Sequence, residues 1–140
     1  MTVRIYVPAT LRSLAGYVGD GGIGPAPVHA RAVTAWLRQQ WPEADEEEWE
    51  YAALVAAADD SAGLLTEDDP QRRVVLAADV DSVLESEGST LVEVHTAFPM
   101  RLVKAVHADT ADLERAASYD PEAQGDLAWY AAQEIPDLLQ

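Results

Sequence analysis

The sequence predicts an α+β fold, a mixed sheet of four to five strands with helices mainly on one face. Two patterns carry this prediction: apolar residues alternate with period two at residues 3–7, as in a strand, and recur every three to four positions elsewhere, as in helices. Strand-like and helix-like segments do not alternate strictly, so helices covering one face of a mixed sheet are the simplest arrangement. The length of 140 residues predicts a single domain, 1–140.

The first half of the chain predicts two strands and three helices. Val3, Ile5 and Val7 form the first strand, which Pro8 should stop because proline has no N–H to donate to a neighbouring strand. Thr10 is placed to cap the helix that follows. Further elements are a Gly/Pro loop at 19–27, a candidate strand at 28–33, a helix after Thr34 that Pro42 ends, and a long helix at 46–65, which Asp45 and Glu48 begin with capping-box spacing.

Three further strands are expected in the second half. The continuous apolar run at 74–78 is typical of a strand that is buried on both faces. Segments 91–96 and 102–107 are separated by AFPMR, so we expect them to pair as a hairpin. After these strands, Asp109 is placed to cap a helix that contains Leu113, Ala116 and Ala117.

The segment DLAWYAAQEIPDLL, at 126–139, is the most distinctive part of the chain. Asp126 is a suitable N-cap, and Pro136 removes one N–H and disfavours helix at Ile135. We therefore expect a helix that ends near Glu134, followed by a short turn whose leucines fold back on the core. The alternative is a docking segment held out for a partner, which would more often be an uninterrupted amphipathic helix.

The charge distribution bears on the partners of the protein. The net charge is −16, and residues 43–70 hold eleven acidic residues and no lysine or arginine. A chain this acidic is repelled by phosphate backbones and anionic lipid, so we expect neither direct nucleic-acid binding nor membrane binding. A basic protein partner is compatible with this charge. The simplest interpretation is that acidity keeps the protein soluble and a monomer or weak homo-oligomer.

Cysteine is absent from the sequence, which excludes disulfides, zinc–thiolate sites, iron–sulfur clusters and thiol catalysis. The start of the chain, MTVRIYVPATL, has no long apolar core behind a basic segment and does not resemble a signal peptide. The longest apolar run, 52–58, is far shorter than a membrane span. We expect a soluble, cytoplasmic protein without a cofactor.

The acidic run at the start of the long predicted helix is the first candidate site. Carboxylates in the first turn of a helix are stabilised by its unpaired N–H groups, which gives this run a purely local explanation. The functional interpretation is a surface for a basic partner. The candidate residues are Glu46, Glu47, Glu48, Glu50, Asp59 and Asp60.

Polar residues at the ends of two predicted strands form an alternative candidate site: Asp79, Asp81, His107 and Asp109. The run VVLAADVDSVL resembles the nucleophile motif of haloacid-dehalogenase-like phosphatases, which places one aspartate as nucleophile and the next as acid/base beside magnesium. It departs from that motif at Ser82, where Thr or Gly is usual. If the two strands run parallel, the four side chains converge, as in a small metal-dependent hydrolase or ligand-binding protein.

Other features receive structural interpretations. GDGGIG at 19–24 has the spacing of a dinucleotide-binding loop, but it follows a helix and precedes PAP, so we interpret it as a flexible loop. In the expected hairpin His95 and His107 lie about 13 Å apart, too far to share a metal ion, so no metal site is predicted there. A self-associating structural protein is a third possibility, with an interface formed by Trp36, Trp41 and Trp49.

Five segments, in this order, carry a family resemblance: RIYVPATL, EEEWEYAAL, RRVVLAADVD, AVHADTADLERA and DLAWYAAQEIPDLL. Together they resemble an uncharacterised family of small actinobacterial proteins over nearly the whole chain. The resemblance implies a cytoplasmic, single-domain bacterial protein and carries over no activity, cofactor or catalytic residue. Because neither a nucleophile elbow nor a phosphate loop is present, the sequence favours a non-enzymatic protein-interaction or regulatory module with an acidic surface.

Overall fold

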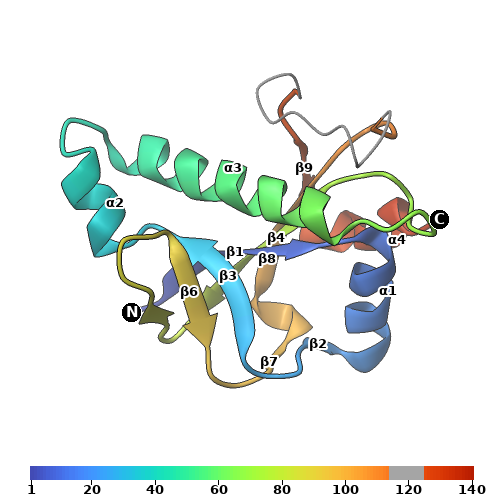
Figure 1. Ribbon diagram of the computed structural model, residues 1–140. Helices are drawn as coiled ribbons and strands as arrows, with labels where there is room; N and C mark the ends of the chain where they lie inside the picture. The colour runs from blue at the N-terminus through green and yellow to red at the C-terminus, as the bar shows by residue number, and fades with distance from the viewer. Residues whose placement is uncertain (114–124) are drawn as a thin grey trace.

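A seven-stranded antiparallel sheet is the frame of the computed structural model, which describes residues 1–113 and 125–140 (Figure 1). The strand order is β5-β6-β3-β1-β4-β8-β9, and a separate two-stranded sheet joins β2 to β7. The strands are β1 (Val3–Ala9), β2 (Gly22–Ile23), β3 (Val28–Ala32), β4 (Val74–Val80), β5 (Leu84–Glu85), β6 (Leu91–Val94), β7 (Phe98–Pro99), β8 (Val103–Ala108) and β9 (Ala128–Ala131).

The helices begin at the capping residues that the sequence indicates. The Asp45 side chain accepts from the Glu48 N–H, and the Glu48 side chain accepts from the Asp45 N–H, so the predicted capping box is confirmed. Thr10 caps the first helix in the same reciprocal way with Ser13. The helices are α1 (Leu11–Asp20), α2 (Ala35–Gln40), α3 (Glu46–Leu64) and α4 (Ile135–Leu138), with 3₁₀ turns η1 (Met100–Leu102) and η3 (Ala132–Glu134).

Helices cover both faces of the sheet, so the expectation of helices mainly on one face is wrong. On one face α3 packs its small side chains Ala53 and Ala57 against Tyr6 and Ala77. On the other face α1, α4 and the β2–β7 pair pack against the sheet, with these residues buried: Leu14, Ile23, Phe98 and Ile135. Figure 1 shows α3 lying along the sheet on the side away from β2 and β7.

The α+β class is confirmed, but the mixed sheet of four to five strands is a wrong prediction. The seven strands pair antiparallel throughout. The sequence underestimates the sheet because β5 has only two residues and because β9 lies in a segment with helix-like spacing. Both are edge strands, which pair with a neighbour on one side only. Their sequences therefore show little of the apolar alternation that identifies a strand.

The predicted hairpin between 91–96 and 102–107 is also wrong. β6 pairs with β3 and β5, whereas β8 pairs with β4 and β9. The chain between them forms β7 and η1, and β7 pairs with β2. AFPMR is therefore a crossover that carries the chain under the sheet and past β3, β1 and β4.

The Gly/Pro loop after α1 has a defined structure. Gly21 ends α1 in the left-handed region, at φ 75°, which favours glycine. Gly22 lies in β2, where a Cβ would be 2.8 Å from the carbonyl oxygen of Phe98. Within GDGGIG, Gly21 thus serves a helix end and Gly22 a close strand contact.

Pro8 lies inside β1 instead of stopping it. It is opposite Val75 of β4, whereas the registered pairing of β1 with β3 ends at Tyr6↔Arg31. Arg73 and Asp109 form a hydrogen-bonded pair, so the N–H and C=O of Val75, two residues on, face β8. Pro8, opposite Val75, therefore has its nitrogen on the β3 side, beyond the last pair there. Its missing donor therefore removes no ladder hydrogen bond.

The last segment forms β9, a 3₁₀ turn and α4, so the predicted helix ending near Glu134 is wrong. Pro136 lies in the first turn of α4, where a missing N–H costs nothing, and it begins a helix that it was expected to prevent. Ile135 is buried in the main core, with Leu138 and Leu139 packed beside it. The expectation that this end closes on the core is confirmed.

Two further expectations concern the helix after Asp109 and the absence of a membrane span. The helix expected after Asp109 falls largely on residues 114–124, outside the described residues. Among the residues that the structure describes, no helix combines the length and apolar character that crossing a membrane requires.

Candidate functional site

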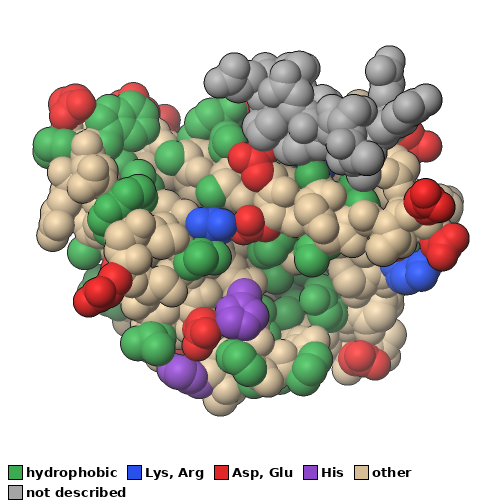
Figure 2. All heavy atoms as spheres, viewed as in Figure 1, with side chains coloured by type: hydrophobic (Ala, Val, Ile, Leu, Met, Phe, Trp, Pro, Cys, Tyr) green, Lys and Arg blue, Asp and Glu red, His purple; other side chains and the backbone are tan. Residues whose placement is uncertain are grey.

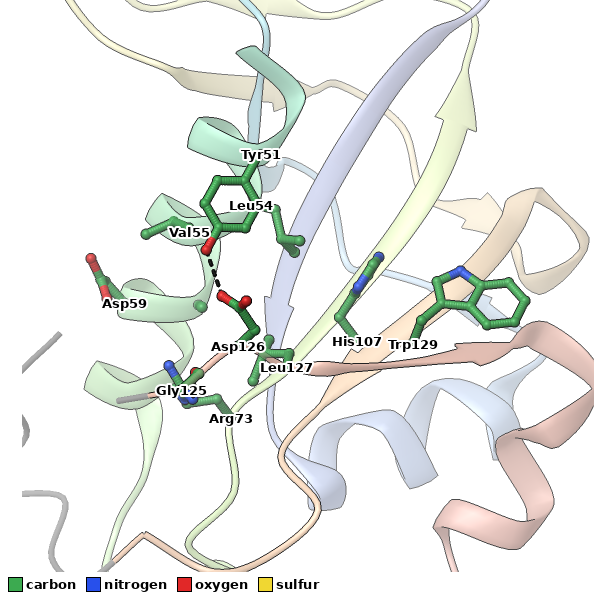
Figure 3. Close-up of a pocket in the computed structure, with 11 residues that line it drawn as sticks. Tyr51, Leu54, Val55, Asp59, Arg73, His107, Gly125, Asp126, Leu127 and Trp129 are labelled. Atoms are coloured by element: carbon green, nitrogen blue, oxygen red, sulfur yellow. Dashed lines mark hydrogen bonds between the residues drawn. The ribbon is translucent and has the colours of Figure 1, made fainter. Parts of the chain in front are cut away.

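A hollow of about 310 Å³ lies between α3 and β9, on the face of the sheet that α3 covers (Figure 3). We call it the α3–β9 groove. It arises because α3 packs over β1, β3 and β4 and leaves β8 and β9 beside it. Its lining side chains are Tyr51, Leu54, Val55, His107, Leu127 and Trp129, with Arg73 and Asp126 at one end.

Large apolar side chains are exposed around this groove. Trp129 is 62% exposed, Tyr51 51% and Val55 38%. Three of the nine large apolar side chains left exposed in the described part of the chain thus line one hollow. Scattered exposed apolar residues need no explanation, but a cluster around a concavity is typical of an interaction site.

A buried ion pair between Arg73 and Asp109 holds together the chain segments at one end of the groove. Arg73 precedes β4 and its Nη2 lies 2.7 Å from Oδ1 of Asp109, which follows β8. The same carboxylate accepts from Arg73 Nε at 2.9 Å and from the Arg73 backbone N–H at 2.8 Å. Arg73 Nη2 also donates to the carbonyl oxygen of Gly125, at 2.8 Å. One guanidinium therefore ties β4 and β8 to the residues that lead into β9.

His107 forms the floor of the groove. It lies opposite Val75 of β4 and opposite Trp129 of β9, and its side chain is half-buried. Burial, followed by the charge of Arg4, lowers the pKa of His107 below its ordinary value, so the ring is neutral at neutral pH. The floor is therefore uncharged: it combines the apolar indole ring of Trp129 with a neutral imidazole that can still form hydrogen bonds.

The open end of the groove carries an acidic group. The Tyr51 hydroxyl donates to Asp126 across the mouth of the groove, as Figure 3 shows. This hydrogen bond, more than burial, raises the pKa of Tyr51. The contact links α3 to the start of β9 and leaves a carboxylate beside the exposed aromatic ring.

The predicted acidic surface is distributed around α3. Glu46 forms an ion pair with Arg38 at 2.9 Å. Glu48 belongs to the capping box. Glu50 accepts from the Tyr6 hydroxyl at 3.3 Å, and Asp60 binds Arg31 through both oxygens, the shorter contact being 2.7 Å.

The two remaining acids of that set lie at different places. Asp59 lines the groove, and Glu47 is exposed near the start of α3. Figure 2 shows acidic side chains at several separate places on the viewed face, with basic side chains beside only some of them. The six candidates thus do not form one continuous patch, and Asp59 is the member that the groove includes.

The strand-end residues of the alternative site lie at opposite ends of the sheet. β4 and β8 pair antiparallel, so the expected parallel arrangement is wrong. His107 is opposite Val75, and Asp79 lies four residues farther along β4, about 13 Å away. Asp79 instead binds Arg4 at 2.6 Å, and this hydrogen bond lowers its pKa.

The other two members of that set follow the same division. Asp81 is exposed beyond the end of β4, whereas Asp109 holds Arg73 near His107. Within residues 1–113 and 125–140 no three His, Asp or Glu side chains are grouped closely enough to hold a metal ion. The structure therefore brings His107 and Asp109 to the groove and leaves Asp79 and Asp81 elsewhere.

Of the three tryptophans proposed for self-association, Trp41 and Trp49 make contacts within the chain. Trp49 Nε1 donates to the Trp41 carbonyl oxygen at 2.9 Å, and the Arg38 guanidinium lies 4.6 Å from the centre of the Trp49 ring. Sequence reasoning missed Trp129 and Arg73 as groove residues. The available signal was weak: Trp129 lies in a four-residue strand, AWYA, and Arg73 is the last residue before a buried strand.

Comparisons with known proteins give one match. A family model described as a family of unknown function (DUF6912) matches residues 3–139. Neither the curated proteins nor the solved structures contain a match to the chain.

Proposed function

This chain belongs to the DUF6912 family, a family of unknown function, and from its geometry we propose that it is a protein-interaction module. The α3–β9 groove binds a basic segment of another protein, and binding regulates that partner without chemistry on it. The proposal places the protein in the cytoplasm as a monomer, where its cysteine-free sequence suits a reducing compartment.

The exposed aromatic cluster carries this proposal. Interfaces are enriched in tryptophan and tyrosine, and the residues that dominate binding are large side chains near a pocket that excludes water. Trp129 and Tyr51 stand on opposite walls of the groove with more than half of each side chain exposed. A partner side chain between them would bury both rings.

The charge supports a basic partner and disfavours a second copy of the chain. Six arginines of the described residues each pair with an acid: Arg4, Arg12, Arg31, Arg38, Arg72 and Arg73. Their charges are locally neutralised, whereas the chain as a whole carries −16. Such a field attracts basic segments at long range and repels an identical molecule.

A small apolar ligand is the second candidate occupant of the groove. The volume of about 310 Å³ is at the lower end of the range for ligand pockets, and the buried Arg73 and half-buried His107 supply polar groups. A ligand-binding protein would show a thermal shift with a metabolite, and a metal-dependent hydrolase would show one with magnesium or manganese. An interaction module should show neither shift.

Affinity capture with matched variants tests the proposal. Wild-type protein, Trp129→Ala and Trp36→Ala are used as baits in one lysate at low and high salt, after thermal melts confirm that each variant folds. Trp36 is also exposed but lies on α2, away from the groove. We expect a partner that is retained by Trp36→Ala, lost with Trp129→Ala and weakened at high salt. An identical set of bound proteins for all three baits at both salts would overturn the proposal.

A further inference from the structure

We infer that the partner binds as an added β-strand along the outer edge of β9, with alternate side chains beside Trp129 at the rim of the α3–β9 groove. This inference rests on the proposed function and specifies the conformation and composition of the bound segment. The segment is extended and alternates apolar residues with lysine or arginine.

Among the described residues, β9 is an edge strand that carries neither a charged residue nor a proline. It ends the strand order and pairs with β8 alone among the described strands. Sheet edges are normally blocked by short length, charged residues, proline or a covering element. The opposite edge follows this rule, because β5 has two residues and one is Glu85. β9 is AWYA, four residues with no charge and no proline.

The hydrogen-bonding pattern shows which backbone groups of β9 point outward. The Asp109 N–H donates to the Arg73 carbonyl oxygen at 3.1 Å, so the pair at this end of β4 and β8 is hydrogen-bonded. In an antiparallel ladder such pairs alternate, so the N–H and C=O of His107, two residues back, also face β4. Those of Val106 and Ala108 consequently face β9.

The same alternation then continues into β9. Val106 is opposite Tyr130, and Ala108 is opposite Ala128. These pairs exchange hydrogen bonds, so the N–H and C=O groups of Trp129 and Ala131 point away from β8. β9 therefore presents both outward backbone groups and the exposed Trp129 side chain.

Side chains of an added strand would lie beside Trp129, on the face of the sheet that carries the groove. Trp129 and His107 form a non-hydrogen-bonded pair, in which side chains on one face are closest. Figure 3 shows the two side chains on neighbouring strands, with His107 between the residues of α3 and Trp129. A strand added beyond β9 continues this face, so an apolar side chain paired with Trp129 covers the indole. Its basic neighbours meet the field of a chain whose net charge is −16.

Peptide selection with a backbone variant tests this inference. A phage-displayed library of random linear peptides is selected against the whole protein, and we expect enriched peptides to alternate apolar residues with lysine or arginine. Ala131→Pro then removes one outward N–H. Ala131 has φ −65°, the value that proline requires, and Tyr130 before it lies in a strand, so the variant should fold.

The affinity of a selected peptide decides between binding modes. Proline removes a hydrogen-bond donor and places a ring on the edge, so we expect about ten-fold or more weaker binding to Ala131→Pro. Ala131→Ser keeps the N–H and should bind within about two-fold of wild type. On binding, amide hydrogen exchange should slow at Trp129 and Ala131, the two residues whose N–H groups point outward.

The remaining outcomes separate this inference from the proposed function. If Trp129→Ala abolishes binding but Ala131→Pro does not, the groove binds a partner in another conformation and strand addition is wrong. If neither variant changes the affinity, both the strand mode and the groove are wrong. If no peptide is enriched, or if the chain instead dimerises in a way that Ala131→Pro abolishes, the inferred basic segment is wrong.

Discussion

The Arg73 guanidinium and the Asp109 carboxylate form the most buried ion pair among the described residues, 2.7 Å apart with side chains 6% and 10% exposed. Arg73 also donates to the Gly125 carbonyl oxygen, so the pair fixes the approach to β9. The α3–β9 groove depends on this contact, because β9 forms one of its walls. A charge pair that joins three chain segments explains how a short edge strand is held in place.

Removing one partner of this pair should be costly. Asp109→Ala leaves the Arg73 charge buried and its backbone N–H unpaired, and we expect the free energy of unfolding to fall by about 3–5 kcal/mol. Urea denaturation measures this change. The matched control is Asp112→Ala, because Asp112 pairs with Arg72 at 2.9 Å with both side chains exposed. That control should cost less than about 1 kcal/mol.

The double variant Arg73→Met, Asp109→Leu separates charge burial from loss of packing. It leaves no unpaired charge, so it should recover much of the stability that Asp109→Ala loses. Equal and small losses for Asp109→Ala and Asp112→Ala would show that the buried pair does not hold the sheet end.

Ser61 is a fully buried polar contact between α3 and the strands β1 and β4. Its Oγ donates to the Ala9 carbonyl oxygen at 2.6 Å and accepts from the Val74 N–H at 2.9 Å, and the side chain is fully buried. Ser61→Ala leaves both backbone groups without this partner, so we expect a loss of about 1–3 kcal/mol in the free energy of unfolding. Thermal or urea unfolding measures it.

Ser82→Ala provides the control for this substitution, because Ser82 is exposed. It should be neutral within about 0.5 kcal/mol. A loss for Ser61→Ala no greater than that of the control would mean that water or a backbone shift replaces the bridging hydroxyl.

His107 should make stability depend on pH. Burial lowers its pKa below the ordinary value of 6.5, so the unfolded chain takes up a proton at higher pH than the folded chain does. This contribution to stability is complete above about pH 6.5 and declines as the pH falls through that value towards the folded pKa. The melting temperature should therefore fall more between about pH 7.5 and about pH 6 in wild type than in His107→Gln.

His95→Gln is the matched control for this measurement, because His95 is an exposed histidine. It should retain the wild-type pH dependence. If His107→Gln retains that dependence as well, another group is responsible and the floor of the groove is not desolvated as described.

Local features of the sequence predicted local structure, whereas strand pairing could not be predicted. The capping signals at Thr10 and Asp45 specify helix starts within a few residues, so both were recognised. The partners of β8 lie at residues 74–80 and 128–131, and no local pattern encodes such distant pairings. Pro136 was misread because proline is favourable in the first turn of a helix and unfavourable only farther in.

The candidate site was only partly predictable for the same reason. Acidic residues of α3 were recognised by composition, but their intramolecular partners, such as Arg31 for Asp60, come from other elements. Trp129 becomes a groove residue only because β9 adds to β8 and places the indole opposite His107. The groove is thus a product of tertiary pairing that single-sequence patterns do not report.

Site-specific photo-crosslinking in cells tests whether a partner occupies the α3–β9 groove. A photoreactive residue replaces Val55, on the wall of the groove, or Val18, on α1 at the other face of the sheet; the two valines are 38% and 42% exposed. We expect one discrete crosslinked partner from position 55, rich in lysine and arginine at the crosslinked segment, and none from position 18. The same products from both positions, or no crosslink at position 55, would contradict this expectation.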